Sequence, residues 1–112
     1  MIKHFSMIKR KKGLTRERFL RHWEEIHGPL VVSKNIPGLR RYVQNHTVPD
    51  VESDIDGIAE LWYDDIESAQ SFVHWLWSSD EAEDLREDIR LFINIEESFI
   101  LFAEEHVMKK MI

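Results

Sequence analysis

The side chains of this chain that can move a proton are histidines, carboxylates and tyrosines, and His27 is the first candidate. It follows Leu20 and Trp23 at spacings of seven and four residues, so a helix there turns all three toward its buried side. At the C-terminal end of that helix the dipole favours a protonated imidazole, whereas burial disfavours it. We therefore expect His27 to be a general acid or base. The alternative is a histidine that only binds a carbonyl at the helix end.

Glu60 is the second candidate, because it interrupts an apolar segment. It lies between Ile58 and Trp62 in residues 57–64, which have the pattern of a strand. A buried glutamate is rare unless it is paired. Burial would raise its pKa and make it a base, or it would orient an imidazole. The alternative is a position on an exposed strip of an edge strand.

Residues 39–48 have the pattern of another strand, with Tyr42 and His46 on the same face. We expect both to line one cavity together with Glu60 and Trp62, and His27 to lie at the helix side of that cavity. Aromatic walls suit a flat ligand, and the tyrosine hydroxyl can donate to a carbonyl or enolate oxygen. The predicted catalytic residues are His27, Glu60 and His46, and the predicted substrate-binding residues are Tyr42, Trp62 and Phe5.

Other kinds of site find little support in the sequence. The chain has no cysteine, which excludes disulfides, thiolate metal sites and a cysteine nucleophile. His22 and His27 are five residues apart, and this spacing separates side chains by about 140° on an α-helix. The four glycines are not clustered, so no phosphate-binding loop is indicated. We predict neither a metal nor a cofactor.

Composition limits the class of protein and its partners. The chain has 112 residues, the size of one domain, which we expect to span 1–112. Fifteen Lys and Arg against 21 Asp and Glu give a net charge of −6, which argues against nucleic acid as a partner. No segment approaches the roughly 18–20 apolar residues of a membrane span, so we expect no membrane partner. The lack of cysteine fits a cytoplasmic location.

Hydrophobic periodicity predicts alternating strands and helices. The order is β-α-β-β-α-β, with the second helical region divided in two, and this is the ferredoxin-like α+β pattern with one four-stranded antiparallel sheet. We expect the acidic residues of the last helix, Asp88 among them, on its solvated face. The predicted strands are 2–9, 39–48, 57–64 and 95–103, and the predicted helices run from Thr15 to Gly28–Pro29, from Ile66 to Leu76, and onward from Ser78.

The last predicted strand is apolar on both faces. Phe99 and Leu101 alternate with Ile100 and Phe102, yet helices can cover only one side of the sheet. An apolar face left in water is an association site. We therefore predict a homodimer in which the helix-free faces of two sheets meet.

Three segments resemble a known family. They are Gly-Leu-Thr-Arg-Glu-Arg-Phe at 13–19, which leads to His-Gly-Pro-Leu at 27–30, the segment 37–46 that begins Pro-Gly-Leu-Arg, and Asp-Gly-Ile-Ala-Glu-Leu-Trp-Tyr at 56–63. Together they resemble the EthD family of the dimeric α+β-barrel superfamily. The resemblance implies a ferredoxin-like protomer that pairs sheet to sheet into a dimeric α+β barrel.

The same superfamily includes small cofactor-free enzymes: muconolactone isomerases, polyketide cyclases and dehydratases, and monooxygenases. We therefore predict an isomerase, dehydratase or cyclase that transfers protons in a small hydrophobic oxygenated substrate, such as a lactone, phenol or polyketide. Two alternatives remain open. One is a non-catalytic dimeric protein that binds a hydrophobic metabolite, and the other is a cofactor-free monooxygenase. A fold alone does not decide among them.

Overall fold

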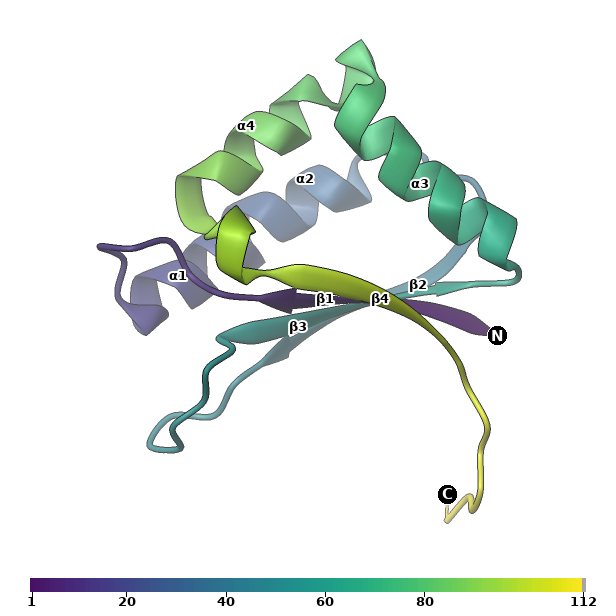
Figure 1. The fold of residues 1–112 in the computed structure, drawn as a ribbon, viewed down its shortest axis with the longest axis horizontal. Helices are drawn as coiled ribbons and strands as arrows, with labels where there is room; N and C mark the ends of the chain where they lie inside the picture. The colour runs from purple at the N-terminus through teal and green to yellow at the C-terminus, as the bar shows by residue number, and fades with distance from the viewer. Residues whose placement is uncertain (112) are drawn as a thin grey trace.

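The computed structural model describes residues 1–111, which form a single antiparallel sheet covered by helices on one face (Figure 1). The strands lie in the order β2-β3-β1-β4, so the first and third strands of the chain are central. This arrangement confirms the predicted ferredoxin-like α+β class. The strands are β1 (Ile2–Ile8), β2 (Leu39–His46), β3 (Gly57–Tyr63) and β4 (Phe99–Glu104). The last strand begins later than predicted because Ile95–Glu97 form a short 3-10 turn, η3, capped by Asn94.

The helices cross the upper face of the sheet in Figure 1. The first helical run consists of α1 (Arg16–His22), η1 (Trp23–His27) and α2 (Gly28–Val32). The second region consists of α3 (Ile66–Ser78), the short turn η2 (Asp80–Ala82) and α4 (Glu83–Phe92). No helix within residues 1–111 has both the length and the apolar character needed to cross a membrane. The cytoplasmic location stays a prediction.

The first helix does not end at Gly28–Pro29, as predicted, but continues through both residues. Thr15 begins it as expected, since its hydroxyl accepts from the backbone N–H of Arg18 at 3.1 Å. The segment η1 is π-helical, and the N–H of Gly28 donates to the carbonyl of Trp23, five residues back. This wider turn lets Pro29 lie in the first turn of α2, where a missing N–H costs nothing.

Trp23 anchors the π-helical segment to the sheet. Its side chain is 1% exposed and stacks on His46 of β2, with ring centroids 5.1 Å apart. A β-carbon on Gly57 would come within 2.4 Å of the indole ring, so only glycine permits this contact. The Gln44 side chain donates to the Trp23 carbonyl at 2.9 Å, and Gly28 leaves the space that this amide occupies. Two glycines thus let helix and sheet approach closely.

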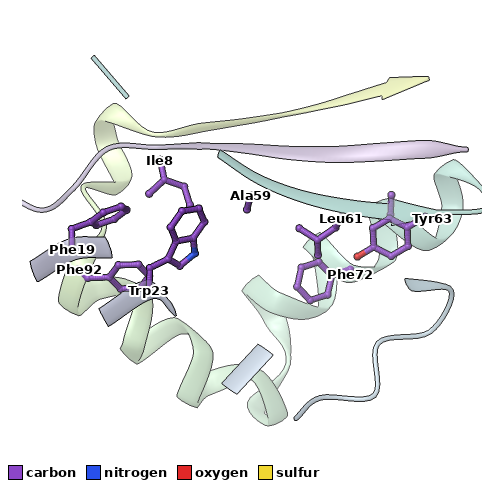
Figure 2. Close-up of a cluster of buried hydrophobic side chains, with 9 residues drawn as sticks. Ile8, Phe19, Trp23, Ala59, Leu61, Tyr63, Phe72 and Phe92 are labelled. Atoms are coloured by element: carbon purple, nitrogen blue, oxygen red, sulfur yellow. The ribbon is translucent and has the colours of Figure 1, made fainter. Parts of the chain in front are cut away.

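The hydrophobic core fills the space between the sheet and the helices (Figure 2). Phe19, Trp23 and Phe92 cluster at one end, and Leu61, Tyr63 and Phe72 lie toward the other. Side chains alternate along β3, so Ala59 and Leu61 are buried while Ile58, Glu60 and Trp62 point to the other face. The helix-free face carries Phe99 and Leu101, which remain 55% and 39% exposed.

We predict that Gly57→Ala lowers the free energy of unfolding by about 1–3 kcal/mol, because the added methyl group overlaps the Trp23 ring. Urea denaturation measures the loss. In the double variant Gly57→Ala/Trp23→Phe the smaller ring makes room for the methyl group. The double variant should therefore lose less stability than the sum of the two single variants. Additive losses would contradict the contact.

Candidate functional site

A cavity of about 180 Å³ lies between the helix-covered face of the sheet and the helices α2, α3 and α4. Its walls are mainly aliphatic and aromatic side chains, such as Leu61, Phe72, Leu85 and Ile89. No lysine, arginine, aspartate or glutamate lines it within the described chain. The polar side chains in its lining are His4, Ser6, His27, Tyr42 and Ser98. This composition is typical of a small-molecule site, with apolar walls and a few polar groups.

His27 presents an imidazole at the wall of this cavity, as the sequence predicted from its helical spacing. The residue is buried, with 8% exposed, and its Nδ1 lies 2.8 Å from Oδ2 of Asp88 on α4. A carboxylate accepts a hydrogen bond, so Nδ1 carries the hydrogen and Nε2 has the free lone pair of the neutral ring. Within residues 1–111, Nε2 makes no hydrogen bond. His27 can therefore accept a proton from a bound molecule.

Asp88 also binds His22, whose Nε2 lies 2.8 Å from Oδ1. The sequence predicted that His22 and His27 point about 140° apart around an α-helix. This is wrong, because η1 is a π-helix. Its backbone hydrogen bonds join residues five apart, so side chains five apart come to lie on one side. Both imidazoles also contact Phe92, with ring centroids 4.7 and 5.0 Å from it. One buried carboxylate thus holds two histidines.

The environment keeps His27 neutral. Burial lowers its pKa, and the hydrogen bond and charge of Asp88 oppose this shift without reversing it. The sequence predicted that the dipole at a helix C-terminus would favour the protonated imidazole. This effect is absent, since His27 lies inside a continuous helical run and not at its C-terminal end. A neutral imidazole held by a carboxylate is the arrangement of a general base.

Tyr42 lines the same cavity from β2. Its hydroxyl oxygen accepts from Nε2 of Gln44 at 3.3 Å, which leaves the hydroxyl hydrogen free for a ligand. Burial raises the pKa of Tyr42, so the hydroxyl stays protonated. His46 does not reach the cavity. It stacks on Trp23 and its Nε2 lies 2.9 Å from Oε1 of Gln44, so it orients the amide that contacts Tyr42.

The predicted single cavity is wrong for Glu60, Trp62 and Phe5, which lie on the helix-free face. Tyr42 pairs with Leu61 across the sheet, so neighbouring Glu60 and Trp62 face the opposite way. Phe5 pairs with Glu60 and points to that same side. The six predicted site residues are therefore not brought together: three lie on the helix-free face, and of the other three only His27 and Tyr42 line the cavity.

Glu60 is held on the helix-free face by hydrogen bonds and an ion pair. Its carboxylate accepts from Nε1 of Trp62 at 2.8 Å and from the Asn45 amide at 3.1 Å, and it pairs with Nζ of Lys3 at 3.1 Å. The same ammonium lies 4.2 Å from the centroid of the Trp62 ring. Burial raises the pKa of Glu60, but these hydrogen bonds lower it further than burial raises it. The carboxyl is thus ionised, contrary to the expected raised pKa.

Three residues of the cavity region escaped the sequence reasoning. Asp88 was expected on the solvated face of α4, yet it is buried. Its spacing from Leu85, Ile89 and Phe92 puts it on their side of the helix, and this signal could have found it. His4 and Ser6 of β1 also line the cavity. Within residues 1–111 no cluster of side chains is placed to hold a metal ion, and the absence of a metal requirement stays a prediction.

We predict that Asp88→Asn lowers the pKa of His27, since the variant removes the negative charge and replaces one of the two accepting carboxylate oxygens with an amide group that donates. A ¹H–¹⁵N NMR titration of the imidazole nitrogens measures both the pKa and the tautomer. Asp84→Asn is the matched control, because Asp84 lies on the same helix, is exposed and pairs with Lys34. An unchanged His27 titration in Asp88→Asn would contradict the pairing.

Comparison with known proteins places the chain in a family. Residues 11–95 match the EthD domain. An EthD family protein from Bacillus halodurans C-125 is similar over 95% of this chain and 99% of its own, with 26% identity and a TM-score of 0.67. A dimeric protein of unknown function with a ferredoxin-like fold from Bacteroides fragilis NCTC 9343 shares 10% identity over 93% of this chain and 95% of its own, with a TM-score of 0.66. A dimeric ferredoxin-like protein of unknown function from Thermobifida fusca YX shares 11% identity over 91% of this chain and 88% of its own, with a TM-score of 0.64. No curated protein matches the sequence. The match over residues 11–95 shows that the chain belongs to the EthD family.

Proposed function

We propose that this protein is an enzyme that transfers protons in a small hydrophobic oxygenated molecule, using its own side chains. One observation supports this function above others: a neutral imidazole with a free Nε2 lies at an apolar cavity, and Asp88 holds its Nδ1 at 2.8 Å. Membership of the EthD family is compatible with this chemistry and names no reaction. Isomerisation, dehydration and cyclisation of carbonyl compounds each have a route that begins with removal of a proton by a base.

In the proposed reaction, Nε2 of His27 takes a proton from a carbon next to a carbonyl group. The electron pair of the broken C–H bond forms a carbon–carbon double bond, and the π pair of the carbonyl group moves to its oxygen, which gives an enolate. Tyr42 donates its hydroxyl hydrogen to that oxygen, and Asp88 stabilises the imidazolium without taking its proton. In a substrate with a double bond next to that carbon, the imidazolium returns the proton to the far end of the conjugated enolate, which completes an isomerisation. In a β-hydroxy carbonyl compound the enolate re-forms the carbonyl group, the C–O bond breaks, and the imidazolium protonates the departing hydroxyl, which leaves as water.

The remaining predicted residues take other places in this proposal. His46 acts indirectly, through Gln44 and its contact with Tyr42. Glu60, Trp62 and Phe5 face the other side of the sheet and take no part in proton transfer. We propose that they belong to the contact with a second copy of the chain.

The helix-free face supports such a dimer. Phe5 and Met7 of β1 pair with Leu101 and Phe99 of β4, so four apolar side chains lie together without a helix over them. Apolar surface removed from water stabilises by about 25 cal/mol per Å². The structurally similar proteins from Bacteroides fragilis and Thermobifida fusca are dimeric, and the same assembly is proposed for this chain.

We predict that the protein accelerates exchange of the benzylic hydrogens of phenylacetone for deuterium in D₂O, followed by ¹H NMR. His27→Gln should lower the protein-dependent rate by at least about 100-fold, because the general base is lost. His74→Gln is the matched control, since His74 is exposed on α3. Exchange at the buffer rate with the wild-type protein would contradict the proposal. Retention of the ketone without exchange would favour the binding protein, and coupled oxygen consumption would favour the monooxygenase.

We predict that the wild-type protein sediments at micromolar concentration with about twice the 13.4 kDa mass of the chain. Leu101→Lys should shift it toward the single-chain mass, because the variant puts a charge in the apolar contact. Leu91→Lys is the control, because Leu91 is also an exposed leucine but lies on α4. A single-chain mass for the wild-type protein would overturn the dimer.

A further inference from the structure

His4 is a buried histidine that the proposed proton transfer does not use. It lies in the middle of the central strand β1, is 3% exposed and lines the cavity. Its ring packs between Phe72 of α3 and Phe102 of β4, with centroid distances of 6.3 and 5.4 Å. Nε2 lies 3.3 Å from the hydroxyl oxygen of Ser6, whereas Nδ1 is buried and has no partner within residues 1–111. Native proteins rarely leave a buried polar atom unpaired.

The His4–Ser6 pair has one hydrogen-bond donor too many for its own needs. Burial lowers the pKa of His4 to about 4, so the ring is neutral and carries a single N–H. If the hydrogen is on Nε2, it is donated to Ser6, and the serine hydroxyl hydrogen stays free. If the hydrogen is on Nδ1, serine donates to Nε2 and the Nδ1 hydrogen stays free. In both tautomers one donor of the pair has no partner within residues 1–111, and both residues belong to the cavity lining.

His4 and Tyr42 lie on the same face of the sheet, two strands apart. His4 pairs with Leu61 of β3, and Leu61 pairs with Tyr42 of β2. Two strand spacings separate the backbones of His4 and Tyr42 by about 10 Å. The cavity thus has polar groups from two different strands, with apolar side chains between them, and no charged side chain from residues 1–111 lines it.

We propose that His4 and Ser6 form a second binding subsite of the cavity, which takes a hydroxyl or carbonyl oxygen of an uncharged, single-ring molecule. The other oxygen of this molecule lies at Tyr42 and His27, a placement that rests on the proposed function. The size follows from the cavity of about 180 Å³, since an apolar cavity of about 150 Å³ holds benzene. The neutrality follows from the lining, because a buried carboxylate without a cation partner is strongly disfavoured.

Two matched ligands test the subsite, namely 4-hydroxyacetophenone and 4-methylacetophenone, which differ by a hydroxyl in place of a methyl group. Isothermal titration calorimetry of the full chain at mildly acidic pH keeps the phenol uncharged. The wild-type protein should bind the hydroxyl compound about 5- to 10-fold more tightly than the methyl compound, as expected for one buried hydrogen bond. The charged analogue 4-acetylbenzoate should bind more weakly than both.

His4→Phe should remove the preference for the hydroxyl compound while retaining binding of 4-methylacetophenone. Ser6→Ala is a second variant that should reduce the same preference and changes the core little. His74→Phe is the matched control, as this histidine is exposed on α3 and does not line the cavity. His4→Phe should also unfold at no lower urea concentration than wild type, because it removes an unpaired buried nitrogen. A histidine with only a structural role would show the opposite, a lower midpoint with unchanged ligand preference.

Three results would overturn the subsite: equal binding of the two acetophenones by wild type, an unchanged preference in both His4→Phe and Ser6→Ala, or tight binding of 4-acetylbenzoate. These measurements involve no turnover, so they separate the two proposals. Loss of the hydroxyl preference with intact phenylacetone exchange overturns the subsite alone. Absence of exchange with an intact preference overturns proton transfer alone.

Discussion

One buried carboxylate joins the two helical regions above the sheet. Asp88 of α4 accepts from His22 and His27 of the first helical run, each at 2.8 Å. An ionised carboxylate in such a place is stable only when its oxygens are paired, so the two helices must keep this position relative to each other. The same contact selects the tautomer of His27 and leaves the lone pair of Nε2 free to accept a proton. Packing of the helices and chemistry of the site therefore depend on one group.

The carboxylate can hold both histidines only because the helix between them is wound more widely. The π-helical turn brings residues five apart onto one side, and Trp23 keeps it in place by packing against Gly57 and receiving the Gln44 amide on its carbonyl. Contacts with the sheet thus fix the position of this turn. π-Helical turns are frequently found at functional sites, and here the turn carries the proposed base itself.

The order of strands and helices was predictable from periodicity, because the hydrophobic residues repeat at two and at about 3.6 residues in the segments concerned. The cap at Thr15 was predictable from residue type. The pairing of Tyr42 with Leu61 could not be predicted, because strand register depends on partners that are distant in sequence. In addition, the register of β2 shifts between Leu39 and Arg41. This is why Glu60 was assigned to the wrong face. Asp88 was hidden among other acidic residues, although its spacing from buried neighbours marks it.

The π-helical turn has a consequence for how this family is compared. Such a turn holds one residue more than the α-helical turn that it replaces, so the place of His27 depends on chain length as well as on residue identity. A relative shorter by one residue between Trp23 and His27 could keep both flanking helices and still present a different side chain to the carboxylate. An alignment that forbids gaps in helices would conceal this change. The inheritance of the site is therefore traced by insertions and deletions in this helix, and not by substitutions alone.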